Sequence, residues 1–261
     1  MEVHHHSHKP KNWKEYITEF IMLFAAVTLG FLAENLREAK VEKERADELL
    51  ISFINDVEYN VSYLDSLIKI DKRALYKTDT AAYYIITTKH QIELQRVYDN
   101  LLDNTRFLSN NDTYEQMKNS GSLRYIKDTI LLHKMIEYSK EIKATEFRSA
   151  TQEYDFSSHE FENTINKFIP ADISAYKHSN LLIKNIDFDS TELVLQQKLK
   201  QLRINKPYLL PQEDEIEFKK VMVPVLLRQS TLIGVTLYFK NKTRAAAIDL
   251  LSYYHSKLNE H

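Results

Sequence analysis

The chain lacks cysteine and is poor in glycine. Its 261 residues include 0 Cys, 3 Gly and 5 Pro, whereas average usage of ~7% would give about eighteen glycines. Phosphate-binding loops, dinucleotide-binding turns and nucleophile elbows need closely spaced glycines, but Gly30, Gly121 and Gly234 lie far apart. The missing cysteine excludes disulfides, thiolate metal sites and cysteine nucleophiles. Since tight hairpins also favour glycine, we predict an all-α protein rather than a sandwich or barrel.

Neither sign of charge dominates. There are 35 Lys and Arg residues against 37 Asp and Glu, and the two signs are interspersed. Binding to nucleic acid requires a basic stripe that neutralises phosphates, so we expect no nucleic-acid partner. Hydrophobic residues make up 43% of the chain and charged residues 28%. That balance is typical of a folded protein rather than a disordered one.

A long apolar run lies near the amino end. Residues 16–33 contain one charged residue, Glu19, and as a helix they rise about 27 Å, close to the ~30 Å hydrocarbon core of a bilayer. A signal-peptide core and a buried helix are alternatives, but residues 20–33 are apolar all round and the cleavage-site pattern fits loosely. We predict a His/Lys-rich tail (1–15), a transmembrane anchor (16–35) and a helical bundle (36–261). The anchor residues are Trp13, Tyr16, Phe20, Phe24 and Phe31.

Two stretches resemble one family of proteins. The first is Met1–His8 followed by Trp13–Arg37, which reads WKEYITEFIMLFAAVTLGFLAENLR, and the second is Thr113–Ile126, TYEQMKNSGSLRYI. Together they resemble a family of uncharacterised single-pass membrane proteins from Bacteroidota. The resemblance implies a single-pass anchor, a helical body and a native histidine cluster, and it implies no activity.

The basic residues that flank the anchor say little about its orientation. Lys9, Lys11 and Lys14 precede the anchor, and four basic residues follow it between positions 37 and 45, so the positive-inside rule gives nearly a tie. A short amino-terminal tail is more easily left in the cytoplasm. We therefore expect a bacterial inner-membrane protein whose body lies in the periplasm.

A 3.5-residue repeat begins after the anchor. Its spacings alternate between four and three residues, as in a coiled coil. The positions that we predict as an oligomer seam are Leu50, Ile54, Val57, Val61, Leu64 and Ile68. The repeat continues to Ile85, but Asp71 and Thr78 occupy two of its positions. These polar residues favour a bundle helix, with a break near Lys89, over a free zipper.

Local signals predict the ends of the shorter helices. Asp112 with Glu115 is typical of a capping box, and Gly121 suits a left-handed residue after a helix. Asp128 is expected to cap a long helix that stops at Pro170. Asp189 is expected to cap another helix.

The last long helix is predicted between Glu213 and Leu258 with a kink at Pro224, and Pro211 shortly before it suits the first position of a helix. Its segment 221–239 is apolar enough to suggest a second membrane span. Arg228 lies at the centre of that segment, and such a residue costs at least ~2.5 kcal/mol at mid-bilayer. We therefore interpret the segment as a core helix in an antiparallel bundle.

Two groups of residues are candidates for chemistry. His4, His5, His6 and His8 are suitable ligands for a transition metal, although a mobile tail provides no second shell of contacts to fix their geometry. Glu19 is an ionisable group in the apolar run and is therefore a candidate for proton or ion binding, unless it lies at the interface. No Glu-x-x-His pair of a di-iron bundle is present.

The sequence therefore predicts a membrane-anchored helical protein that serves interaction, scaffolding or sensing, and not an enzyme. Its expected partners are the lipid membrane and either further copies of itself or other envelope proteins, with no cofactor. The alternative is a subunit of an ion- or proton-coupled membrane complex that uses Glu19.

Overall fold

A computed structural model describes residues 13–98, 105–150, 162–168, 189–201 and 208–259. Over these ranges the protein is all-α, and its one β contact is an isolated bridge between Glu93 and Leu209. The elements are α1 (Trp13–Thr87), α2 (Leu94–Tyr98), α3 (Asp112–Ser120), the 3₁₀ helix η1 (Ser122–Tyr125), α4 (Thr129–Arg148), α5 (Glu162–Ile165), α7 (Ser190–Gln201) and α8 (Glu215–Leu258). The predicted fold class is confirmed.

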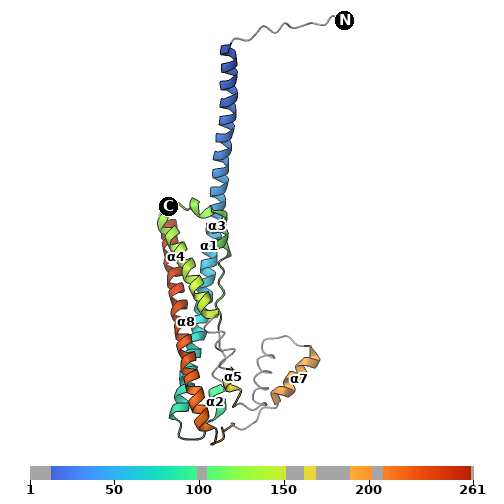
Figure 1. The fold of residues 1–261 in the computed structure, drawn as a ribbon, viewed down its shortest axis with the longest axis vertical. Helices are drawn as coiled ribbons and strands as arrows, with labels where there is room; N and C mark the ends of the chain where they lie inside the picture. Colours follow the sequence, from blue (N-terminus) through green and yellow to red (C-terminus); the bar gives the residue numbers. More distant parts are fainter. Residues whose placement is uncertain (1–12, 99–104, 151–161, 169–188, 202–207, 260–261) are drawn as a thin grey trace.

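Helix α1 is 75 residues long and runs without a break from the apolar segment into the body (Figure 1). No proline lies within it, and its one glycine, Gly30, has no neighbouring atom within 4 Å of a built Cβ. At 1.5 Å per residue the helix is about 110 Å long. It ends at Thr87, close to the break predicted near Lys89.

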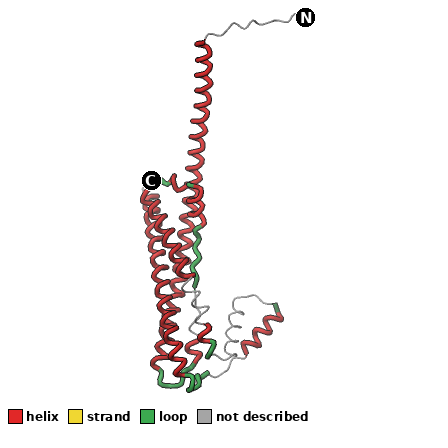
Figure 2. Tube along the Cα trace, in the orientation of Figure 1, coloured by secondary structure: helices red, strands yellow, loops and turns green. Residues whose placement is uncertain are grey.

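Three long helices form the body. Helix α8 runs antiparallel to α1 along most of the body, and α4 runs antiparallel to α8 beside its carboxyl-terminal half (Figures 1 and 2). Helix α3 and η1 pack on α1 near the end of the body from which α1 projects. The carboxyl end of the chain lies at that same end, whereas α8 begins at the opposite end.

The core consists of three clusters that follow one another along α1. The one nearest the projecting segment joins Phe53 and Val57 to Met135 of α4 and Leu250 of α8. The middle one joins α1 to α8 through Leu64, Ile68, Phe107, Ile233 and Leu237. The far one contains Ala82, Ile85, Ile92, Phe218 and Met222. Helix α1 contributes to all three, because its buried face follows the predicted repeat.

An ion pair lies inside the core. Lys240 of α8 and Asp71 of α1 are both fully buried, with the ammonium nitrogen 2.5 Å from the carboxylate oxygen. The Thr105 hydroxyl donates to the other Asp71 oxygen, and Lys240 Nζ donates to that hydroxyl oxygen over 2.8 Å. The polar residue that interrupts the apolar repeat therefore has a charged partner, which links α1, α8 and the segment before α3.

Several helix ends follow the local predictions. The Asp128 carboxylate accepts hydrogen bonds from the backbone N–H groups of Ile130 and Leu131, and Gly121 has a left-handed φ of 75°. The Asp189 carboxylate likewise accepts from Thr191 and Glu192. Each of these predictions depended on a side chain and its immediate neighbours, and each is confirmed.

Three other predictions about helix ends are wrong. Asn111, not Asp112, is the residue before α3, and no side chain caps that helix. Helix α4 ends at Arg148 rather than Pro170. Pro211 lies in a turn before α8, which begins at Glu215.

We predict that Lys240→Met strongly destabilises the protein. The substitution leaves the Asp71 carboxylate buried without its cation, which typically costs about 3–5 kcal/mol. Replacing both charges, in Asp71→Leu with Lys240→Met, should recover much of that loss because no unpaired charge remains. Urea unfolding of the full chain in detergent, followed by circular dichroism, measures both effects. A Lys240→Met variant within ~0.5 kcal/mol of the wild type would contradict this account.

A second prediction concerns acid pH. The backbone N–H of Leu131, together with the Tyr253 hydroxyl and the N–H of Ile130, holds the pKa of Asp128 below its ordinary value. The stability that this cap contributes is therefore present above the unfolded pKa of about 3.9 and is lost as the pH falls through the lower folded pKa. Asp128→Asn keeps a good cap but removes the titration. Its urea midpoint should fall less than that of the wild type between neutral and acid pH, and equal losses would refute the assignment.

Candidate functional site

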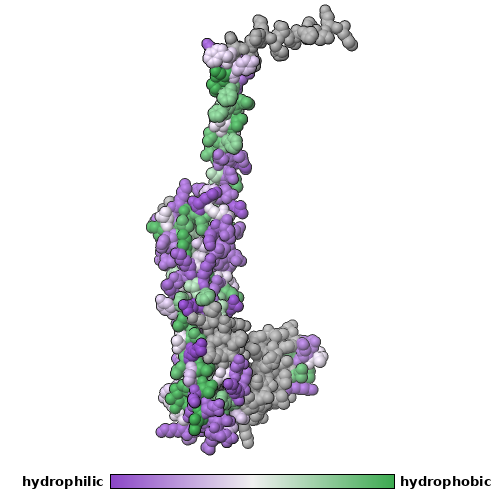
Figure 3. All heavy atoms as spheres, viewed as in Figure 1, coloured by the Kyte–Doolittle hydropathy of each residue, from purple (hydrophilic) through white to green (hydrophobic). Residues whose placement is uncertain are grey.

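The apolar run predicted as an anchor projects from the body as a bare helix. Every residue of α1 from Trp13 to Val41 is exposed, and Phe20, Phe24 and Phe31 each expose more than 60% of their surface. Figure 3 shows the projecting part of α1 as largely hydrophobic, beyond a body on which hydrophilic and hydrophobic residues are mixed. A hydrophobic surface of this kind is unfavourable in water, and it matches the length of a bilayer core.

Two of the described helices, α1 and α8, are long and apolar enough to cross a membrane. They differ in burial, because none of the apolar window of α1 is buried in the protein, whereas 33% of that of α8 is. They also lie at opposite ends, since α1 projects from one end of the body and α8 begins at the other (Figure 1). One bilayer therefore cannot hold both apolar windows in this conformation. The buried residues of α8 favour its predicted role as a core helix.

Glu19 lies in the second turn of α1, at the outer end of the apolar run. It borders a shallow recess on the helix surface with Lys14, Glu15 and Thr18. The Thr18 hydroxyl donates to the Lys14 carbonyl over 2.9 Å. Four polar residues on two adjacent turns are typical of the headgroup region, where charge costs little. This location favours a Glu19 carboxylate at the membrane–water interface over one inside the bilayer core.

A charged collar separates the apolar run from the body. Between Glu34 and Arg45 the chain carries four basic and four acidic residues. Arg37 pairs with Glu34 at 2.5 Å, and Lys40 pairs with Glu44 at 3.9 Å. The collar ends at Ala46, the first fully buried residue of α1. It forms a helical stalk that connects the exposed apolar run with the bundle.

The predicted oligomer seam is buried within one chain. Ile54, Val57, Leu64 and Ile68 are in the cores formed with α4, α8 and the segment before α3, and Leu50 and Val61 pack against them. The coiled-coil spacing therefore reflects packing against helices of the same chain. In this conformation the seam is not an exposed surface for a second copy.

The predicted metal ligands His4, His5, His6 and His8 lie outside the described residues. Within the described ranges no group of three or more His, Cys, Asp or Glu residues is arranged to hold a metal ion. The predicted anchor aromatics and Glu19 all lie along the exposed amino-terminal part of α1.

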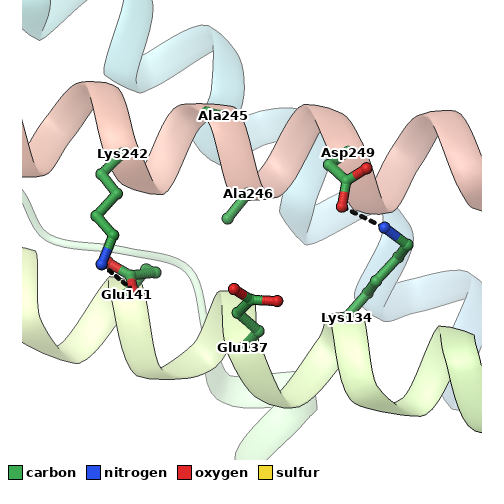
Figure 4. A pocket seen from close by; sticks show the side chains of 7 residues that line it. All are labelled: Lys134, Glu137, Glu141, Lys242, Ala245, Ala246 and Asp249. Carbon is green, nitrogen blue, oxygen red and sulfur yellow. Dashed lines mark hydrogen bonds and ion pairs between the residues drawn. The ribbon is translucent and has the colours of Figure 1, made fainter.

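A groove between α4 and α8 is lined by five charged residues and two alanines (Figure 4). Lys242 pairs with Glu141 at 2.7 Å, and Lys134 pairs with Asp249 at the other end of the groove. The Glu137 carboxylate lies between these pairs in Figure 4, and Ala245 and Ala246 form the side contributed by α8. Because both ion pairs cross from one helix to the other, the groove is best described as a clamp that holds α4 on α8.

A polar junction that sequence reasoning missed fixes the segment before α3. The buried Asn60 amide donates to the Asn110 carbonyl and accepts from the Asn110 N–H, over 2.7 and 2.9 Å. It also donates to the Tyr138 hydroxyl over 3.1 Å. Burial raises the pKa of Tyr138, so that hydroxyl stays neutral. The one signal of this junction in the sequence is Asn60 itself, which lies between the apolar repeat positions Val57 and Val61.

Comparisons with known proteins give no match: no family model, curated protein or solved structure is similar to this chain.

We predict that Glu19→Gln leaves membrane insertion unchanged, because the place of Glu19 at the outer end of the apolar run favours an interfacial carboxylate. Moving the carboxylate inward, in Val27→Glu, should impair insertion, since charge is costly near the bilayer centre. Alkaline extraction of membranes measures the inserted fraction of both variants. Equal insertion of Val27→Glu and the wild type would show that this segment does not cross the bilayer core.

Proposed function

We propose that this protein is a membrane-anchored helical scaffold whose body presents interaction surfaces at a set distance from the bilayer. The observation that carries the proposal is the unbroken α1, which is fully exposed over its apolar run and then enters the core at Ala46. One helix therefore contacts lipid at one end and packs against other helices at the other. A rigid connection of this kind holds a body in a defined place.

The proposal assigns the body to interaction rather than catalysis because its polar groups are used in packing. Asp71, Lys240 and Thr105 bind one another, and the charges of the α4–α8 groove pair across it.

We extend the proposal to a single-pass inner-membrane protein with a periplasmic body and to membership in the Bacteroidota family that residues 13–37 and 113–126 resemble. Labelling a single His90→Cys with an impermeant maleimide tests the orientation, since the chain has no other cysteine and His90 is exposed.

We expect the full-length protein to remain in the membrane after alkaline washing. The double substitution Leu23→Arg with Val27→Arg should release it, because each arginine at mid-bilayer costs at least ~2.5 kcal/mol. The measurement is the fraction of protein recovered in the membrane pellet.

The matched control places two arginines on the apolar window of α8. Leu227 and Tyr238 are exposed by 50% and 63%, so Leu227→Arg with Tyr238→Arg disturbs no core. This variant should stay in the pellet. Release of the control together with retention of the Leu23/Val27 variant would identify α8 as the membrane segment and overturn the proposal.

A further inference from the structure

Helix α8 carries an uncharged stripe on its outer face. Its positions alternate between spacings of four and three residues, and we call them the outer stripe: Leu227, Thr231, Gly234, Tyr238, Asn241, Ala245, Ile248 and Ser252. Leu227, Tyr238 and Ile248 expose 50%, 63% and 37% of their surfaces. Thr231, Asn241, Ala245 and Ser252 are also exposed. Hydrophobic residues are thus held in water at regular positions along the helix.

The helices of the same chain flank this stripe without covering it. On one side, α1 is joined to α8 by the Arg244–Asp65 pair. On the other side, α4 is joined to α8 by the Lys242–Glu141 pair. The opposite face of α8, which includes Ile233, is buried in the core. The outer stripe therefore points away from the bundle along about 38 Å of helix.

We propose that the outer stripe is the contact between two copies of this chain, which pair in parallel through α8 and α8 of the partner. A spacing of 3.5 residues keeps one seam facing a parallel partner helix over many turns. The small residues Gly234, Ala245 and Ser252 allow close approach of the two backbones. Asn241 provides a polar seam position of the kind that fixes register in parallel pairs.

Charges beside the stripe support a second copy in parallel orientation. In a parallel coiled coil, the residue just before every second seam position faces a residue of the partner helix whose number is five higher. Arg244 and Asp249, which pair with Asp65 and Lys134 of their own chain, have this spacing and opposite charge. Two-fold symmetry therefore brings each of them opposite the other on both sides of the seam. The neighbouring facing pairs contain at most one charge each, since Leu237 faces Lys242 and Ser230 faces Val235. No like charges therefore meet across the seam.

The parallel orientation rests on the proposed function, because an anchor at one end of α1 forces two copies in one membrane to point the same way. The two-fold axis then lies along the bundle, which is the direction of α8 (Figure 1). This seam takes the role that the sequence predicted for Leu50–Ile68, on a different helix.

Crosslinking tests the seam directly, since the chain has no native cysteine. Ser252→Cys and Ala245→Cys are made in the full-length protein in membranes and treated with a short bis-maleimide. The matched control is Ser62→Cys, at an exposed serine of α1 outside the stripe. We expect a band of twice the chain mass for Ser252→Cys and Ala245→Cys and none for Ser62→Cys.

A second measurement separates the seam from pairing by the anchor. Ala245→Glu should shift the detergent-solubilised protein from dimer to monomer mass with an unchanged helical circular dichroism spectrum, and Ser62→Glu should leave it dimeric. No crosslink at either stripe position, a crosslink to another protein, or a dimer that survives Ala245→Glu would overturn the proposal. A dimer that forms normally but is found in the soluble fraction would refute the anchor and leave the seam intact.

Discussion

The register between α1 and α8 determines where every other part of this protein lies. Apolar contacts alone tolerate sliding of one helix along another, whereas a buried ion pair has one partner and one position. Asp71 and Lys240 are fully buried and bonded to each other and to Thr105. They therefore fix the place of α8 along α1. The position of α4 is then fixed as well, because ion pairs join it to α8. The bundle ends at Ala46, where the stalk meets it.

A buried pair of this kind contributes little net stability, because removing two charges from water offsets most of their attraction. The three apolar clusters supply the favourable free energy of burial. The pair sits among these clusters along α1 and selects one arrangement of them. Asn60 acts in the same way nearer the stalk, since its amide is satisfied only when residue 110 and Tyr138 are both in place.

Several features that depend on neighbouring residues were predictable, whereas features that depend on distant pairs were not. Asp128 and Gly121 act within one helical turn, so their types identify them. The helical class and the projecting apolar run follow from composition and length. The partner of Asp71 lies 169 residues away, and no local pattern indicates it. The repeat of α1 showed correctly which face is buried but not that α4 and α8 of the same chain bury it.

In the proposed membrane-anchored arrangement, the stalk also sets the distance between the charges of the body and those of the bilayer surface. Its 12 residues from Glu34 to Arg45 rise about 18 Å, and headgroups occupy roughly 5–7 Å beyond the hydrocarbon core. The remaining gap is longer than the ~8 Å over which physiological salt screens charge. The first ion pairs of the bundle are therefore shielded from the surface potential of an anionic leaflet.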